Sequence, residues 1–597
     1  MATDTTDPEL EQATWNLEDL VDGQGADGVQ RLLDEAQQRA DAFAETYAGR
    51  IGELDGPRLA EAMRDLERIG DLGGRAGSYA QLDFSVDTQD PARGALVAKV
   101  TELSTAIETK LVFFELEWAA VDDERAEELL AHPDLDFARH YLRTARRYRP
   151  HLLSEPEEKL MAEKAQTGRS AWGRLFAELM AQVEVDGEPL EVALSRLMHP
   201  DREVRRTTAE GVTKALEPGL RTRAYIFNTL VLDKAVDDRL RSYSSWIQSR
   251  NLSNEASDES VAALVEAVKG RYEIARRWYR LKAKLLGIDR LADYDRIAPV
   301  TQDQQTISWR DAREMVLDSY TSFSPDLGKL AGRFFDERWI DAPLRPRKRG
   351  GAFCAYTVPS VHPYVLLNWT SKRRDVLTLA HELGHGVHAA LAREQGLFQQ
   401  GTPLTLAETA SVFGEELVFG RLLDEAEDAE SRLSLLAEAM EGQIATVFRQ
   451  IAMNRFEDSL HTARRSEGEL AVERIGELWR AAQEDLLGDA VEVTEGYGSW
   501  WSYVPHFVNT PGYVYAYAYG QLLALSVYRR YEEEGASFVP SYLELLRAGG
   551  SRSPEELGAI VGVDLADPGF WDAGLDLVER QLEAAEEAAR EARGVTP

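Results

Sequence analysis

The pattern His381-Glu382-x-x-His385 constrains this chain more than any other feature of its sequence. On a helix, positions i and i+4 lie on one face, a single turn apart. His381 and His385 can therefore present two imidazoles to one zinc ion, while Glu382 can hold a zinc-bound water and take its proton. The apolar residues that lead into the motif favour a buried helix. Asp375 or Ser371 can cap its start.

A catalytic zinc site uses three protein ligands and leaves one position for water. The metzincin pattern would need Gly at position 388 and His at 391, but this chain has His388 and Leu391. Glu408 is the best downstream candidate. The zinc helix can run about eleven residues past the motif, roughly 16 Å, and segment 397–404 can span about 26 Å to return. The competing interpretation is a capping box, Thr405-Leu-Ala-Glu408, and the residues alone leave both open.

Two further polar residues accompany the expected ligands. Glu415 follows Glu408 by seven residues on the same helical face. It could orient a ligand histidine or be an ordinary solvated carboxylate. His388 shares the face of His381, and we expect it to pack near the site or support the ligands rather than to act as a fourth ligand.

An aromatic run at 496–521 holds six tyrosines, two tryptophans and a histidine. Its Pro-Gly start and the apolar residues after it favour a helix over a strand. That helix would place Tyr513 and Tyr517 on one face and Tyr515 and Tyr519 on the other. Phenol and imidazole donors can stabilise the oxyanion formed in peptide hydrolysis. The alternative is an aromatic layer of the core.

Helical periodicity runs through most of the chain and predicts a mostly α fold. The exceptions are a hairpin signal at Asp186-Gly187 and two short strands within 345–369, just before the zinc helix. We expect the latter to form a small sheet whose edge can pair with an extended peptide; an ordinary core hairpin is the alternative. The expected organisation is a disordered segment at 1–13, a helical lobe at 14–195, a catalytic domain at 196–590 and a disordered tail at 591–597.

Charge and cysteine content exclude several classes of function. A net charge of −35 disfavours nucleic acid and anionic membranes as partners. Cys354 is the single cysteine, so no intrachain disulfide is possible. The sequence shows neither a secretory signal at its start nor an apolar run of about 18 residues. A cytoplasmic protein is therefore expected, and the oligomeric state is not indicated.

The combination of motifs resembles the oligoendopeptidase F branch of the thimet-oligopeptidase-like family of zinc peptidases. The segments that carry the resemblance are Leu379–His388, Leu406–Glu415, His506-Phe507 with the tyrosine-rich helix, the Trp15–Leu20 start and the 350–369 strands. The resemblance implies one zinc ion per chain on His381, His385 and Glu408, with Glu382 as general base. It further implies His506 and a tyrosine as transition-state donors, with Tyr513 chosen first and Tyr517 next. Both tyrosines are also expected to contact substrate.

The fold that the resemblance implies is a helical ellipsoid with a deep channel that admits flexible oligopeptides. The expected function is hydrolysis of internal bonds in short unstructured peptides. A metallocarboxypeptidase is the main alternative, and the basic residues at 345–349 are its only conspicuous candidates for binding a C-terminal carboxylate. A non-catalytic, zinc-stabilised peptide-binding protein would have no need of Glu382. A purely structural zinc site would normally have four protein ligands.

Overall fold

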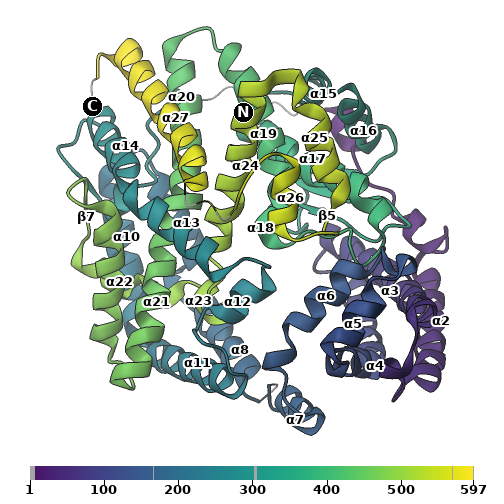
Figure 1. Ribbon diagram of the computed structural model, residues 1–597. Coiled ribbons are helices and arrows are strands. Elements are labelled where there is room, and N and C mark those ends of the chain that lie inside the picture. Colours follow the sequence, from purple (N-terminus) through teal and green to yellow (C-terminus); the bar gives the residue numbers. More distant parts are fainter. Residues whose placement is uncertain (1–6, 166, 302–305, 566, 568, 596–597) are drawn as a thin grey trace. The chain divides into compact units, whose positions relative to one another are not determined.

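The structure is a computed structural model that describes residues 7–165, 167–301, 306–565, 567 and 569–595. The protein is mostly helical, as Figure 1 shows. Helices account for 73% of the residues and strands for 4%. The mostly α class with a small sheet is therefore confirmed. Within the described residues, no helix is both long enough and apolar enough to cross a membrane.

The chain folds into two compact units, each assembled from three separate stretches. The first unit comprises 1–149, 304–421 and 530–564, and the second comprises 150–303, 422–529 and 565–597. The bounds of these units differ from those of the expected lobe at 14–195 and domain at 196–590. The expected division stays a prediction.

The expected metal ligands lie in the first unit. The helices of this unit are α1 (Pro8–Gln12), α2 (Gly25–Tyr47), α3 (Gly56–Val86), α4 (Pro91–Ala120), α5 (Asp123–Leu130), α6 (Arg139–Arg147), α15 (Trp309–Phe323), α16 (Pro325–Asp336), α17 (Arg373–Ala392), α18 (Leu404–Ala407), α25 (Val539–Ala548) and α26 (Pro554–Ile560). Helices α19 (Ser411–Asp424) and α24 (Tyr515–Glu534) each continue from one unit into the other.

The helices of the second unit carry the aromatic run. They are α7 (Glu155–Ala165), α8 (Arg169–Ala181), α9 (Leu190–Ser195), α10 (Arg202–Leu216), α11 (Leu220–Leu240), α12 (Gln248–Ser253), α13 (Asp258–Gly270), α14 (Tyr272–Leu285), α20 (Ala429–Gln443), α21 (Arg449–Glu467), α22 (Val472–Leu487), α23 (His506–Asn509) and α27 (Phe570–Arg593). A π-helical turn, Ile444–Phe448, joins α20 to α21.

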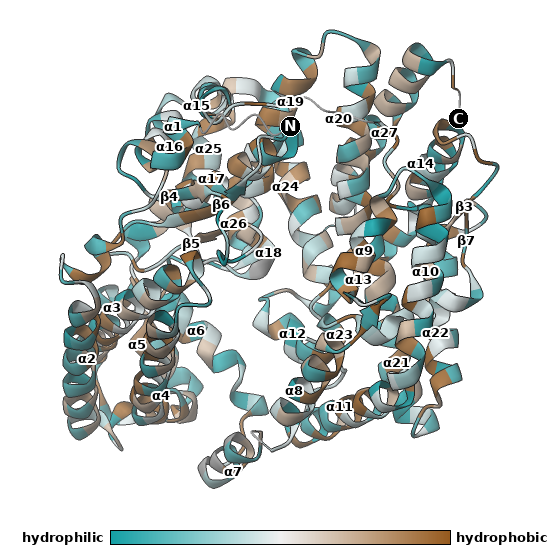
Figure 2. Ribbon diagram, turned by 180° about the vertical axis from the view of Figure 1, so that it is seen from behind, coloured by the Kyte–Doolittle hydropathy of each residue, from teal (hydrophilic) through white to brown (hydrophobic). Residues whose placement is uncertain are grey.

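Amphipathic patterning explains the packing at the start of the first unit. Helix α2 buries Val29, Leu32, Ala36, Ala40 and Phe43, which recur every three or four residues. This stripe packs against α3 and α4. Hydrophilic and hydrophobic residues alternate along these helices in Figure 2.

Three short strands form the sheet beside α17. They are β4 (Ile340–Pro343), β5 (Phe353–Ala355) and β6 (Tyr364–Trp369), in the order β4-β6-β5. Strand β6 is parallel to β4 and antiparallel to β5, and it packs on α17. The two expected strands are confirmed as β5 and β6, with β5 at an edge of the sheet. Strand β4 was not predicted, because it is short and contains a proline, and its residues are all buried although one of them is Asp341.

The expected hairpin is β1 (Glu184–Val185) paired with β2 (Glu188–Pro189). Its turn residues Asp186 and Gly187 have φ of 54° and 81°, as a type I′ turn requires. The second unit also contains a parallel pair, β3 (Leu291–Ala292) with β7 (Val491–Glu492).

Expectations for the two ends of the chain need correction. Residues 8–12, expected to be disordered, form α1, because the Asp7 carboxylate accepts hydrogen bonds from the N–H groups of Glu9 and Leu10. Residues 1–6 lie outside the described part. Helix α27 reaches Arg593, past the expected start of a disordered tail at 591, and Gly594 ends it with φ of 65°. Residues 596–597 are not described.

Candidate active site

Helix α17 carries the His-Glu-x-x-His pattern. Its N-cap is Lys372, which corrects the expectation of Asp375 or Ser371. Asp375 still caps the helix from inside its first turn, since its carboxylate accepts hydrogen bonds from the N–H groups of Thr370 (2.7 Å) and Lys372 (3.0 Å). The helix ends at Ala392, and Gly396 closes the following turn with φ of 77°.

The three expected ligands come together. Nε2 of His381 lies 3.4 Å from Oε2 of Glu408, and Nε2 of His385 lies 3.5 Å from the same oxygen. All three donor atoms lie within 4.8 Å of one another. A tetrahedral ion with bonds of about 2.0–2.1 Å separates its donors by about 3.3 Å. The residues present therefore suit zinc by donor type, number and spacing.

Glu408 reaches this position through a break between two helices. Helix α18 ends at Ala407, Glu408 follows it, and α19 begins at Ser411. The expectation that Glu408 and Glu415 lie on one helix was therefore wrong. The capping-box interpretation was also wrong, because Pro403 is the N-cap of α18 and Glu408 stands past its end. The Glu408 carboxylate instead accepts a hydrogen bond from Ser411 Oγ at 2.6 Å.

A glycine inside the motif permits the close approach of this break to α17. A Cβ added at Gly384 would lie 2.3 Å from the carbonyl oxygen of Ala410 and 2.5 Å from Cα of Ser411. Gly414 on α19 is similar, since a Cβ there would lie 2.0 Å from the Tyr320 hydroxyl, which donates to the carbonyl of Ala380 at 2.7 Å. Sequence reasoning missed both glycines, although a glycine in a helix interior is an available signal.

Glu415 contacts one of the histidines. Its Oε2 lies 3.2 Å from Nδ1 of His381, so a proton on Nδ1 leaves Nε2 as the lone pair that faces Glu408. Burial lowers the pKa of His381, but the hydrogen bond to Glu415 and the charges of Glu408, Glu415 and Glu382 outweigh it and raise the pKa to about 9. The carboxylates therefore create a field that attracts a cation. His388 is buried at 3% exposure beside the site.

Glu382 occupies the position expected of a base. Its side chain is buried, with 7% of the residue exposed. Burial raises its pKa to about 7, while His381 and the backbone N–H of Cys354 favour the charged form. A pKa close to the working pH is the optimum for a group that takes and returns a proton.

A pocket of about 350 Å³ opens beside these residues, entirely within the first unit. Glu382 and His385 form one wall, and Phe353, Cys354 and Tyr356 form another. The second wall is the outer edge of the sheet, because among the described residues β5 pairs only with β6. Burial raises the pKa of the Tyr356 hydroxyl and of the Cys354 thiol well above their ordinary values, so both are neutral. Sequence reasoning did not single out Tyr356.

The aromatic run lies in the second unit. His506 begins α23, whereas Tyr513 precedes α24 instead of lying on it, which corrects the expected helix start. His506, Tyr513 and Tyr517 nevertheless cluster: their ring centroids are 5.1–6.2 Å apart. His506 Nε2 lies 3.3 Å from the Tyr517 hydroxyl. Burial, followed by the charge of Arg449, lowers the pKa of His506.

The other two tyrosines are core residues. The Tyr515 hydroxyl accepts from Asn254 Nδ2 at 3.0 Å, and the Tyr519 hydroxyl lies 3.1 Å from Ser260 Oγ. Both side chains are buried, at 0% and 1% exposure. Tyr513 and Tyr517 are instead partly exposed, so the predicted pairing of the tyrosines holds although Tyr513 lies before the helix and not on its face.

Comparisons with known proteins identify the family of this chain. A profile of peptidase family M3 matches residues 196–577, and one of oligopeptidase F matches 117–184. The chain is 26% identical over 592 residues to oligopeptidase PepF of Bacillus subtilis, covering 96% of this chain and 87% of that protein. It is 28% identical over 517 residues to group B oligopeptidase PepB of Streptococcus agalactiae, covering 84% and 86%.

Solved structures show the same fold. The crystal structure of oligoendopeptidase F from Enterococcus faecium aligns with a TM-score of 0.71 at 22% identity, covering 94% of this chain and 98% of that one. The resemblance drawn from the motifs is therefore confirmed. Because the M3 profile spans more than half of the sequence, this chain belongs to peptidase family M3 and is a metalloendopeptidase.

Proposed function

We propose that the chain is a zinc-dependent endopeptidase that hydrolyses internal bonds of short, unstructured oligopeptides. The observation that carries the proposal is the convergence of His381, His385 and Glu408 on one point, with the buried Glu382 beside them. The relatives named oligopeptidase support the substrate class.

In this proposal one zinc ion is held by Nε2 of His381, Nε2 of His385 and the carboxylate of Glu408. When bound, zinc lowers the pKa of a coordinated water towards about 7 and polarises the substrate carbonyl. Glu415 holds the His381 ring through Nδ1 at 3.2 Å, which keeps the ring in the orientation that binding needs.

Glu382 takes the proton of the attacking water and returns it to the leaving amine. Its burial supports this role, because a carboxyl with a pKa of about 7 can both accept and donate a proton near neutral pH. The N–H of Cys354 favours the charged form of this carboxyl and so partly offsets the rise in its pKa.

The substrate backbone is proposed to lie along the edge of β5. An edge strand offers N–H and C=O groups that can pair with an extended chain, and β5 lines the same pocket as Glu382 and His385. Only a flexible peptide can extend along such an edge, which favours unstructured oligopeptides over folded proteins.

We further propose that His506 and Tyr513 donate hydrogen bonds to the oxyanion and that both Tyr513 and Tyr517 contact substrate, as the resemblance implies. Support comes from the cluster of the three rings and from their partial exposure, in contrast to the buried Tyr515. The contact with Tyr517 orients the His506 ring.

Three of the four basic residues at 345–349, the candidates of the carboxypeptidase alternative, have acidic partners. Lys348 is buried and donates to Asp341 at 2.6 Å, and Arg345 lies 3.6 Å from the same carboxylate. Arg347 pairs with Asp87 at 2.7 Å. These three cations have structural partners, whereas the fourth, Arg349, lies 4.9 Å from the Phe353 ring centroid. The paired cations make the carboxypeptidase the weaker of the two proposals.

The test is digestion of a peptide of about ten residues, acetylated at one end and amidated at the other, with products read by mass spectrometry. Internal cleavage that stops with a chelator and returns with zinc is the expected result. Cleavage that persists in a verified metal-free preparation would refute the role of zinc. A strict requirement for a free C-terminus would instead indicate a carboxypeptidase.

A further inference from the structure

The second unit contains a pocket of about 300 Å³ that the proposed reaction does not use. Helix α14, the segment Asp293–Ile297, the π-helical turn and the segment Trp500–Tyr503 contribute to its walls. Leu194, Leu197 and Ile297 make part of the lining apolar. A π-helical turn is rare and is often found at functional sites.

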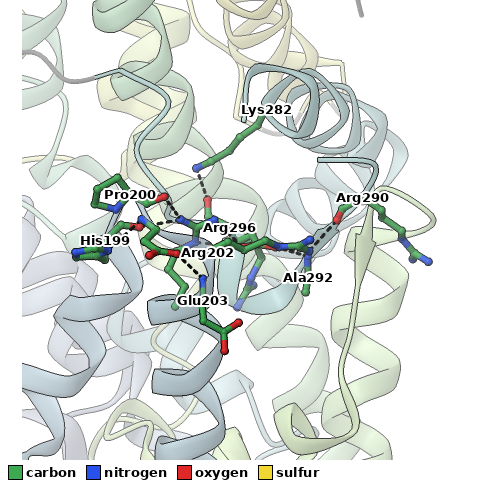
Figure 3. Close-up of polar contacts among 11 residues, drawn as sticks. His199, Pro200, Arg202, Glu203, Lys282, Arg290, Ala292 and Arg296 are labelled. Atoms are coloured by element: carbon green, nitrogen blue, oxygen red, sulfur yellow. Dashed lines mark hydrogen bonds and ion pairs between the residues drawn. The ribbon is translucent and has the colours of Figure 1, made fainter. Parts of the chain in front are cut away.

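Most charges around this pocket are already paired. Lys282 donates to the carboxylate of Glu441 and to the carbonyl of Arg296, and Figure 3 shows the Lys282 side chain reaching that carbonyl. Arg296 donates to the carbonyl of Asp293 and to the Tyr497 hydroxyl, while the Asp293 carboxylate balances its charge. These two cations and two anions leave no net charge.

Arg449 is the exception. It begins α21 directly after the π-helical turn and lines the pocket. Its Nε is buried and finds no hydrogen-bond partner within the described parts of the chain, where the guanidinium also lacks an ion pair. The pocket therefore carries one uncompensated positive charge.

The remaining polar groups are donors as well. Trp278 is fully buried, and its Nε1 has no hydrogen-bond partner among the described residues. The phenols of Tyr279 and Tyr503 also line the pocket, and their pKa values are raised to about 12, chiefly by burial, so both keep their protons. A buried donor without an acceptor is unfavourable unless a ligand supplies one.

We propose that this pocket binds the carboxylate of a peptide, with Arg449 as the anchoring cation. A planar guanidinium pairs with a carboxylate through two parallel hydrogen bonds, and a single excess charge suits a monoanion. The volume and the apolar lining suit one apolar residue next to that carboxylate. The choice of a peptide as ligand rests on the proposed function, and the charge of Arg449 also acts on His506.

The test measures binding, so that it does not depend on turnover. Full-length Glu382→Gln protein is titrated into a fluorescein-labelled peptide that ends in leucine, either as the free acid or as the amide. The acid is expected to bind about tenfold more tightly, the effect of a charge-assisted hydrogen bond. Adding Arg449→Gln should remove this preference while leaving the affinity for the amide unchanged, which also shows that the variant has folded.

Arg455→Gln is the matched control, because Arg455 lies on the same helix and pairs with Asp458 at 3.1 Å; it should keep the preference. Arg449→Lys should keep part of it. Equal binding of acid and amide, or a preference that survives Arg449→Gln, would overturn the proposal.

Two further arms identify the ligand. The first compares the free-acid peptide with an amidated peptide that ends in glutamate. If the two bind equally tightly, the pocket accepts a side-chain carboxylate as well as a C-terminal one. Acetate should displace the acid peptide more effectively than chloride at the same ionic strength, whereas equal displacement would overturn the assignment to a carboxylate. The wild type could fail to hydrolyse these peptides and still prefer the free acid over the amide. That result would refute the proposed function but support the carboxylate pocket.

Discussion

Substituting Gly384 by alanine should weaken zinc binding strongly while the chain still folds. The added Cβ would lie 2.3 Å from the carbonyl oxygen of Ala410 and 2.5 Å from Cα of Ser411. Both are backbone atoms, so no side chain can rotate away to relieve the clash. Glu408 stands two residues before Ala410 and must move with this segment.

The size of the effect follows from these distances. Ordinary carbon contacts lie near 3.5 Å or beyond, so the segment must retreat by about 1 Å. Metal–ligand distances tolerate only about 0.2 Å. We therefore expect zinc affinity to fall by about 10–100-fold, the usual result when ligand positioning is lost. The overpacked contact should also lower the free energy of unfolding by about 1–3 kcal/mol.

The assay is competition for zinc with a chromophoric chelator, alongside urea denaturation. Gly332→Ala is the matched control, because Gly332 lies within α16 of the same unit and a Cβ there would meet nothing within 4 Å. Its zinc affinity should be that of the wild type, and its stability equal or higher by up to about 1 kcal/mol. Wild-type zinc affinity in Gly384→Ala would refute the argument that this glycine positions Glu408.

Three other predictions concern buried or partly buried glutamates. Glu382→Gln should retain zinc while turnover falls by orders of magnitude, because the shape remains and the base is lost; near-normal turnover with full zinc content would remove its assigned role. Glu408→Gln should lose zinc in elemental analysis with little change in thermal stability, whereas unchanged zinc with lower stability would mean a structural role. Burial raises the pKa of Glu457 to about 8, so its contribution to stability is complete below pH about 4.5 and is lost as pH rises through 8. In Glu457→Gln, urea denaturation should show a smaller loss of stability between those pH values, while Gln still accepts the hydrogen bond from Gly512 N–H; an unchanged pH dependence would count against the buried acid.

Local spacing predicted the parts of the site that lie within one element. His381 and His385 follow from the geometry of a single helix, and β5 and β6 follow from their composition and neighbouring turns. Glu408 could be named but not placed, because a capping box and a ligand at the end of α18 look alike in sequence. The Ser411 contact and the position of Pro403 exclude the capping box, and the role of Glu408 as a ligand stays a prediction.

What the sequence could not predict depends on contacts between distant segments. The segments of the two units alternate along the sequence, so no change in composition marks a boundary between the units. The start of α24 at Tyr515 is set by the turn at Gly512, whose N–H donates to the buried Glu457 at 2.8 Å. Helical periodicity alone could not indicate that partner. Arg449 also looked ordinary in sequence, because an arginine is notable only when its surroundings lack an acid.

The interleaved units have a consequence for synthesis on the ribosome. The metal donors are complete once the chain has passed Glu408, but the segment Arg530–Asp564 packs beneath them: the Tyr542 ring stacks on Phe413 at 4.2 Å, and Gly550 N–H donates to the carbonyl of Gln399 at 2.8 Å. A nascent chain that stops before this segment lacks these supports. Domains generally fold as units during translation, so the proposed metal site should mature only after this segment has been synthesised. Chains that terminate before this segment should then be inactive, even though they contain His381, His385 and Glu408.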